Sequence, residues 1–184
     1  MKSTLIIFLF LLLSVLTYLG FYNAFYSPKI NTGIDGGEII VYQTSKGQYH
    51  LTDSLMKIVF NEVYEVNNIV VNKGFSKFYS TPDYRDKQTI GFDAGCIVEP
   101  ADSLKLSAID ETFSITKIEK THYLLSEFPL KGRMSILIGA RKVYPQLDKY
   151  CKENGYRMDV PVFEIYDRKA QKITYRRTLV KNIQ

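Results

Sequence analysis

A glutamate and a tyrosine two positions apart, in a short apolar strand, are the side chains in this sequence best suited to hold a charged ligand. Residues 161–167 read PVFEIYD, a pattern typical of a strand. Because successive side chains of a strand point to opposite faces, Glu164 and Tyr166 share one face. Phe163 and Ile165 share the other face, which we expect to pack against helices. Glu164 then points to the open face, where a carboxylate flanked by aromatic rings can hold a cation and where burial would raise its pKa.

Three other roles for Glu164 fit the same residues. It could be a solvated sheet residue, or it could pair with Arg176 or Arg177 on the adjacent strand. It could also act as a general base toward water in a hydrolase. The sequence carries no nucleophile elbow, phosphate-binding glycine loop or paired-carboxylate signature. A binding protein is therefore favoured over an enzyme, and we expect no catalytic residue.

The positions of cysteine and histidine argue against a metal or haem site. His50 and His122 have no partner at ligand spacing, and Cys96 and Cys151 are far apart in the sequence. Two cysteines permit one disulfide but do not argue for it. We expect neither a metal nor a cofactor.

Composition indicates a basic, tyrosine-rich chain. The 184 residues carry a net charge of +5, with 14 Tyr, 11 Phe and no Trp. Tyrosine combines a large apolar ring with a polar tip, so it suits both strands and ligand clefts. The densest basic stretch could meet phosphates or anionic lipid headgroups, or could be a solvated sheet face; it comprises Arg168, Lys169, Lys172, Arg176, Arg177 and Lys181.

The first residues predict a membrane anchor. Residues 4–21 carry no charge and are long enough to span a hydrocarbon core of about 30 Å. Aromatic residues cluster at the end of this run, as in an interfacial belt. A cleaved signal peptide is the competing reading, but bulky residues follow where a cleavage site would lie. We expect a single-pass protein that contacts the membrane through residues 4–26. The membrane would be the bacterial inner membrane or the endoplasmic reticulum, depending on the source.

The rest of the chain predicts one duplicated domain. We expect an anchor at residues 1–28, a polar linker at 29–37 and the domain at 38–184. Each half runs strand, glycine turn, helix, strand, strand, and the spacing from Gly47 to Tyr79 nearly equals that from Gly132 to Tyr166. The expected helices lie near residues 53–67 and 134–154, and the expected strands near 38–44, 75–80, 89–98, 113–128, 161–167 and 172–180.

This organisation predicts an α+β fold, with duplicated strand-helix-strand-strand units forming one antiparallel sheet. Both helices would lie on one face of the sheet, and one transmembrane helix would precede the domain. The opposite face, or the seam between the halves, is then free to form a cleft.

Several short motifs resemble the GyrI-like family, the fold of bacterial gyrase inhibitors and of effector-binding domains in multidrug-sensing regulators. They are residues 47–49 (GQY), 77–82 (KFYSTP), 91–98 and 163–166 (FEIY). The resemblance implies a small-molecule ligand, cationic or aromatic, and places the glutamate of the last motif, Glu164, in the central cleft. It also places aromatic side chains near that cleft. The implied ligand-binding residues are Glu164, Tyr166, Tyr49, Tyr79, Phe92 and Tyr175, with Phe78 beside them.

A longer stretch, residues 140–150 (ARKVYPQLDKY), together with the anchor, resembles a testis-expressed autophagy receptor of the endoplasmic reticulum. That receptor acts through a disordered C-terminal tail that binds autophagy proteins, and the sequence given stops just after the last expected strand. We therefore do not carry the receptor activity over, although a scaffold for another, unknown protein partner stays open. An anchor stands where a DNA-binding segment would precede the domain, so we expect no nucleic-acid partner.

Overall fold

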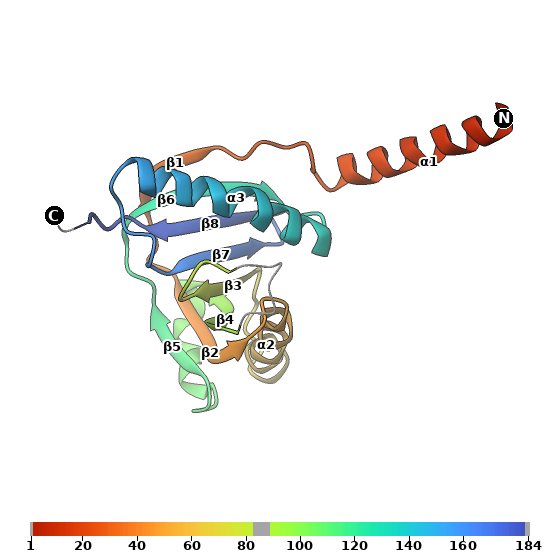
Figure 1. Ribbon diagram of the computed structural model, residues 1–184. Helices are drawn as coiled ribbons and strands as arrows, with labels where there is room; N and C mark the ends of the chain where they lie inside the picture. The colour runs from red at the N-terminus through yellow and green to blue at the C-terminus, as the bar shows by residue number, and fades with distance from the viewer. Residues whose placement is uncertain (1, 83–88, 183–184) are drawn as a thin grey trace.

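The computed structural model describes residues 2–82 and 89–182 (Figure 1). Along the domain, pairs of strands alternate with helical segments. In chain order the elements are α1 (Lys2–Phe21), β1 (Ile30–Asp35), β2 (Ile39–Gly47), α2 (Leu51–Phe60), a π-helical turn η1 (Asn61–Val66), β3 (Lys73–Phe78), β4 (Ile90–Val98), a 3-10 helix η2 (Pro100–Ala108), β5 (Ser114–Lys117), β6 (Thr121–Pro129), α3 (Arg133–Glu153), β7 (Val162–Asp167) and β8 (Lys172–Thr178).

The strands of the described residues form one eight-stranded antiparallel sheet in the order β1-β6-β8-β7-β3-β4-β2-β5. Two repeats, β2-α2-β3-β4 and β6-α3-β7-β8, make up its centre. In each repeat the last strand lies between the other two, and β3 of one repeat pairs with β7 of the other. The predicted α+β class and the predicted duplication are confirmed.

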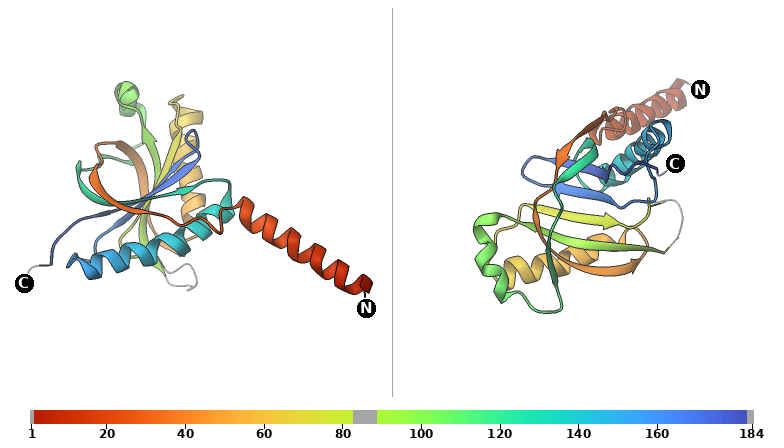
Figure 2. Two further views of the ribbon diagram at one scale, coloured as in Figure 1. Left: turned by 90° about the horizontal axis from the view of Figure 1, so that it is seen from above. Right: turned by 90° about the vertical axis from the view of Figure 1, so that its left-hand side faces the viewer.

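The sheet is strongly curved (Figure 2). Two short connections, β1–β2 and β5–β6, each join strands at opposite ends of the strand order, so the two ends must lie close together. The β1–β2 and β5–β6 connections meet: the Gly37 amide donates to the Ile118 carbonyl at 2.9 Å, and the Ile118 amide donates to the Glu38 carbonyl at 2.8 Å. Gly36 has φ +100°, and a Cβ at this position would lie 2.1 Å from the Glu119 carbonyl oxygen. Only glycine fits this crossing, which brings the two ends of the sheet together.

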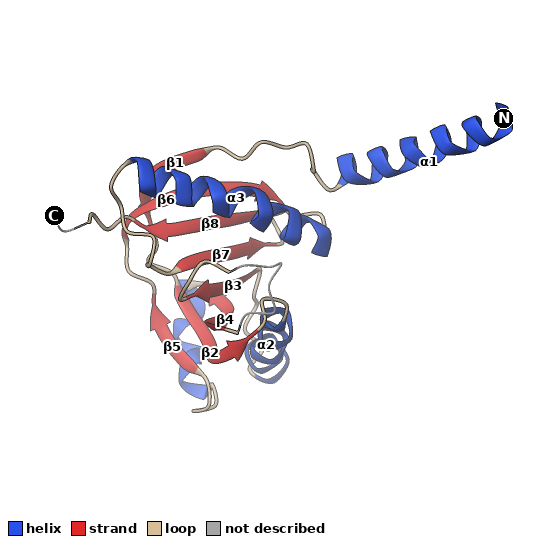
Figure 3. Cartoon of the chain, in the orientation of Figure 1, coloured by secondary structure: helices blue, strands red, loops and turns tan. Residues whose placement is uncertain are grey.

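Helices α2 and α3 cover the same face of the sheet, and we call this the helix face (Figure 3). Val59 of α2 packs with Val41 of β2, and Leu147 of α3 packs with Leu124 of β6. Apolar residues recur every three or four positions along both helices, so each helix buries one stripe on the sheet.

Residues expected in the linker instead supply an edge strand. β1 pairs antiparallel with β6, Ile30 opposite Ser126 and Asp35 opposite Thr121. The β-branched residues Ile30, Thr32 and Ile34 occupy every second position of β1, a pattern typical of a strand. The glycines and polar residues around them led to the prediction of a linker.

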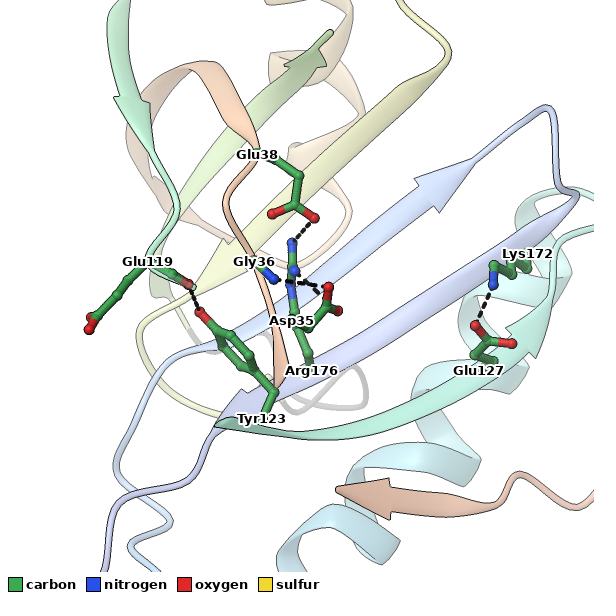
Figure 4. Close-up of polar contacts among 8 residues, drawn as sticks. All are labelled: Asp35, Gly36, Glu38, Glu119, Tyr123, Glu127, Lys172 and Arg176. Atoms are coloured by element: carbon green, nitrogen blue, oxygen red, sulfur yellow. Dashed lines mark hydrogen bonds and ion pairs between the residues drawn. The ribbon is translucent and has the colours of Figure 1, made fainter. Parts of the chain in front are cut away.

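The face without helices is filled rather than open. Arg176 of β8 is fully buried there, 3.2 Å from an Asp35 carboxylate oxygen and 3.0 Å from one of Glu38 (Figure 4). Its guanidinium lies 5.4 Å from the ring centroid of Tyr123 and 5.6 Å from that of Phe163. Because Asp35 and Glu38 flank the β1–β2 crossing, this arginine ties the curled sheet together. The prediction of an open, helix-free face is wrong.

Helix α1 projects away from the domain (Figures 1 and 2). Residues Ser3–Phe21 have a mean hydropathy of 2.5 and none of this stretch is buried in the chain, so α1 is long and apolar enough to cross a membrane. The segment after α1 is held to the domain. Tyr26 packs edge-on against Phe128 with ring centroids 5.5 Å apart, and Lys142 donates to the Tyr26 carbonyl at 2.7 Å.

Candidate functional site

Glu164 lies at the centre of the sheet on β7 and is fully buried. Its carboxylate accepts a hydrogen bond from Tyr144 of α3, so Glu164 and Tyr166 point to the helix face. Phe163 and Ile165 lie on the opposite face. The predicted alternation is correct, but the predicted assignment of the two faces is wrong. All residues of β7 from Val162 to Tyr166 are buried, so apolarity alone did not distinguish its faces.

Three tyrosine hydroxyls surround the Glu164 carboxylate. Tyr49 donates at 3.0 Å to Oε1 and 2.8 Å to Oε2, Tyr144 donates to Oε1, and Tyr166 donates to Oε2. Tyr175, directly opposite Glu164 on β8, packs edge-on against Tyr144 with centroids 5.7 Å apart. Tyr49 comes from the first repeat and the other tyrosines from the second. We call Tyr49, Tyr144, Tyr166 and Tyr175 the tyrosine shell.

Burial dominates the electrostatics of this cluster. It raises the pKa of Glu164, and the hydrogen bonds from Tyr144, Tyr166 and Tyr49 offset part of that rise. The pKa of each shell tyrosine is raised well above its ordinary value, first by burial and then by the charge of Glu164. The hydroxyls therefore stay protonated at neutral pH and act as donors.

No described cation contacts the Glu164 carboxylate. Arg176 binds Asp35 and Glu38 on the other face. Arg177 is fully buried on the helix face and donates to Asp148 at 2.7 Å and to Thr81 at 2.7 Å. The alternative in which Glu164 pairs with either arginine is wrong, and so is a solvated position for Glu164 or for these two members of the basic stretch.

A cleft of about 950 Å³ runs along the helix face between α2 and the start of α3, at the seam between the repeats. Met56 and Phe60 of α2 and Ile136 of α3 line its walls, and Cys96 lies on its floor. Tyr166 lines the cleft on one side and hydrogen-bonds Glu164 on the other. Glu164 itself is therefore behind the cleft wall, one tyrosine ring away from the open space.

The predicted site residues divide between the two faces. Tyr49, Tyr166 and Tyr175 belong to the tyrosine shell. The ring of Phe78 stacks on that of Tyr49 with centroids 5.3 Å apart, and the ring centroid of Phe92 lies 6.4 Å from that of Phe78. Both phenylalanines therefore pack against the shell from within the core.

Tyr79 does not join them. It lies on the helix-free side and donates to both oxygens of Asp93 at 2.8 Å. Burial, and then the hydrogen bond to Asp93 and the charge of that carboxylate, raise the pKa of Tyr79 to about 12.

Sequence reasoning missed Tyr144 and, apart from Arg168, the charged residues that line the cleft. Tyr144 belongs to the stripe Ala140, Tyr144, Leu147 and Cys151, whose spacing marks the buried side of α3. That spacing could have placed a fourth tyrosine on the sheet.

Cys96 and Cys151 are free, buried thiols. Among the described residues, no group of three or more His, Cys, Asp or Glu side chains is placed to hold a metal.

No protein-family model matches the sequence, and no curated protein is significantly similar to it. The resemblance to the autophagy receptor therefore stays a prediction.

Solved structures share the fold. The C-terminal domain of EcmrR superimposes with a TM-score of 0.59 at 11% identity, covering 84% of this chain and 99% of that domain. EcmrR in its complex with DNA gives 0.60 at 10% identity, covering 98% of this chain and 69% of that one. SAV2435 bound to tetraphenylphosphonium gives 0.51 at 10% identity, covering 84% and 94%. At 10 to 11% identity these likenesses concern the fold alone, and they agree with the predicted α+β fold.

Proposed function

We propose that this chain is a membrane-tethered, GyrI-like binding protein that takes a small cationic or aromatic ligand in the α2–α3 cleft, with Glu164 as the charged contact. One observation carries the proposal. Glu164 is a fully buried carboxylate that receives hydrogen bonds from neutral tyrosines, with no described cation beside it. Burial of an ionised carboxylate without a counter-charge destabilises the folded chain. A cation that binds beside Glu164 removes this destabilisation, which favours binding.

The tyrosine shell suits such a ligand. The rings of Tyr49, Tyr166 and Tyr175 can contact an aromatic or cationic body through their faces. Movement of the Tyr166 ring would connect the cleft to the carboxylate, since Tyr166 is the wall between them. Support by analogy comes from SAV2435, which has this fold and binds tetraphenylphosphonium, a phosphorus cation carrying four phenyl rings.

The tether is proposed from α1. Its exposed apolar surface has no partner within the described chain, and the bilayer supplies one. A cleaved signal sequence passes the same length and hydropathy test, so fractionation of the expressed full chain decides between them. Carbonate-resistant membrane retention, with an intact N-terminus, is the result expected for an anchor.

The ligand proposal is tested by calorimetric titration of tetraphenylphosphonium into the full chain, solubilised in a neutral maltoside detergent. The wild type is expected to bind. Glu164→Gln keeps the shape and removes the charge, and its affinity should fall by about tenfold or more, as for loss of a buried charge contact. Glu127→Gln is the matched control, because Glu127 is exposed on β6, and it should bind like the wild type.

The outcomes separate the candidate functions. Equal affinity in wild type and Glu164→Gln removes Glu164 from the site. Turnover of an activated ester that is lost in Glu164→Gln would favour a hydrolase, since a raised glutamate pKa suits a general base. Copurification of a protein without any response to ligand would favour the scaffold related to the autophagy receptor. Absence of a nucleic-acid partner stays a prediction.

A further inference from the structure

The rim of the cleft is strongly basic. Its lining includes five basic side chains, Lys57, Lys73, Lys131, Arg133 and Arg168, and one acidic side chain, Asp53. A concave site bordered by one sign of charge focuses the electrostatic field and attracts ligands of the opposite sign. The rim thus favours an anion, whereas Glu164 behind the wall favours a cation.

Among the described residues, only part of the rim charge is compensated. Asp53 binds Lys57 at 3.0 Å and Arg133 at 2.6 Å. Partial burial acts to raise the pKa of Asp53, but the hydrogen bonds from Lys57 and Arg133 lower it below its ordinary value. Lys73 lies 3.7 Å from Asp167. The Asp53 carboxylate therefore neutralises only part of the charge of Lys57 and Arg133, and the ion pair between Lys73 and Asp167 is long.

Lys131 and Arg168 have no acidic partner among residues 2–82 and 89–182. The Lys131 ammonium lies 5.0 Å from the ring centroid of Phe21. Burial raises the pKa of the Cys96 thiol on the cleft floor to about 12, and the positive charge of Arg168 opposes that rise, as expected for a guanidinium close to the cleft. Helix α3 also begins at the rim with no acidic residue in its first turn, so its positive dipole end adds to the field.

The cleft also adjoins the end of the apolar helix. Phe21, the last residue of α1, lines the cleft, and α1 ends beside the start of α3 (Figures 1 and 2). If α1 spans a bilayer, the cleft mouth lies at the level of the lipid headgroups. Its inner walls are apolar, formed in part by Met56, Phe60 and Ile136.

We propose that the ligand of this cleft is an amphiphile with an anionic, phosphate-type headgroup, drawn from the membrane surface. This inference rests on the proposed function, since it uses the same cleft and the same tether. The phosphate lies on the rim against Lys131 and Arg168, and the apolar part lies against Met56 and Phe60. A bare cation would have to pass the basic rim, whereas a ligand that also carries a phosphate is attracted there and can direct a cationic group toward Glu164.

The test is calorimetric titration of the full chain in neutral maltoside detergent with three probes. Dihexanoyl phosphatidic acid has both phosphate and apolar chains, dihexanoylglycerol lacks the phosphate, and inorganic phosphate lacks the chains. We expect phosphatidic acid to bind at least about tenfold more tightly than either partial probe, and its affinity to fall as salt is added. Tight binding of inorganic phosphate alone would replace the amphiphile by a free phosphate ligand, and equal binding of dihexanoylglycerol would overturn the role of the rim.

Charge reversal at the rim supplies the matched comparison. Arg168→Glu should weaken phosphatidic acid binding by about tenfold or more, through loss of one charge contact and gain of a repulsive one. Lys169→Glu makes a like charge change at the next residue, which does not line the cleft, and should change affinity by less than about twofold. Lys131→Glu, an exposed side chain with a separate rim position, repeats the test if Arg168→Glu unfolds.

The two proposals fail separately. If tetraphenylphosphonium binds through Glu164 while phosphatidic acid does not bind, the headgroup inference fails and the cleft proposal stands. If phosphatidic acid binds and both rim reversals leave its affinity unchanged, the rim is not its site. If neither probe binds, both proposals are overturned.

Discussion

Among the charged side chains that the sheet buries, Arg176 on one face and Glu164 on the other have opposite surroundings. On the helix-free face, Arg176 lies against two carboxylates, Asp35 and Glu38, which come from the crossing that closes the sheet. On the helix face, Glu164 lies against neutral tyrosine hydroxyls and beside a cleft. A buried charge with its counter-charges in place holds a structure together. A buried charge without them, next to open space, is available to a ligand.

Removal of Arg176 should have the largest effect. Arg176→Met leaves Asp35 and Glu38 facing each other without a counter-charge and frees the crossing. We expect a loss of about 3 kcal/mol in the free energy of unfolding, as for a buried pair broken on one side. Urea unfolding of the full chain in detergent measures it.

Lys172→Met is the control on the same strand, because Lys172 also binds a carboxylate, that of Glu127, but at a solvated position (Figure 4). Its expected cost is about 0.5 kcal/mol or less. Equal losses in Arg176→Met and Lys172→Met would show that Arg176 does not close the sheet.

Neutralisation of Glu164 should act in the other direction. Its folded-state pKa is raised above the ordinary value of 4.5, so between pH 4.5 and that raised pKa the folded chain holds a proton that the unfolded chain has released. Stability from this group is fully present below about pH 4.5 and is lost as pH rises through the raised pKa. Glu164→Gln lacks this loss and should be more stable than the wild type once the pH exceeds the raised pKa of Glu164.

Urea unfolding at a series of pH values measures the effect. The difference between Glu164→Gln and wild type should grow as the pH rises above 4.5 and level off above the raised pKa of Glu164. A difference that does not change with pH would mean that the pKa of Glu164 is the same in the folded and unfolded chain. Burial of its charge would then not destabilise the fold.

Much of the fold follows from the sequence, because it depends on periodicity. The stripes of α2 and α3 and the repeated glycine turns fix the two strand-helix-strand-strand units. The face of Glu164 does not follow, because β7 is buried on both sides and alternation alone leaves two choices. The curl that buries the second face depends on the crossing at Gly36 and on Arg176, whose partners are far away in the chain. For the same reason Arg176 and Arg177 resemble a solvated basic stretch in the sequence although both are fully buried.

The smallest expected effects separate the two tyrosines that the sequence placed together. Tyr49→Phe removes one donor to Glu164 in both the free and the bound chain, so tetraphenylphosphonium affinity should change by only about threefold, within the net contribution of one hydrogen bond. Tyr79→Phe acts at Asp93 on the other face and should leave affinity within about 1.5-fold, which is less than 0.3 kcal/mol. Calorimetric titration of both variants measures the contrast. Equal effects would remove the distinction between the faces.

The most direct test of the account is an NMR titration of the Glu164 carboxyl carbon in the full chain, with and without saturating tetraphenylphosphonium. Burial among tyrosines predicts a pKa above 4.5 in the free chain. A cation that reaches the carboxylate stabilises its ionised form, so the pKa should fall when the ligand is bound. The same raised pKa in both states would contradict the claim that Glu164 is the charged contact for a ligand.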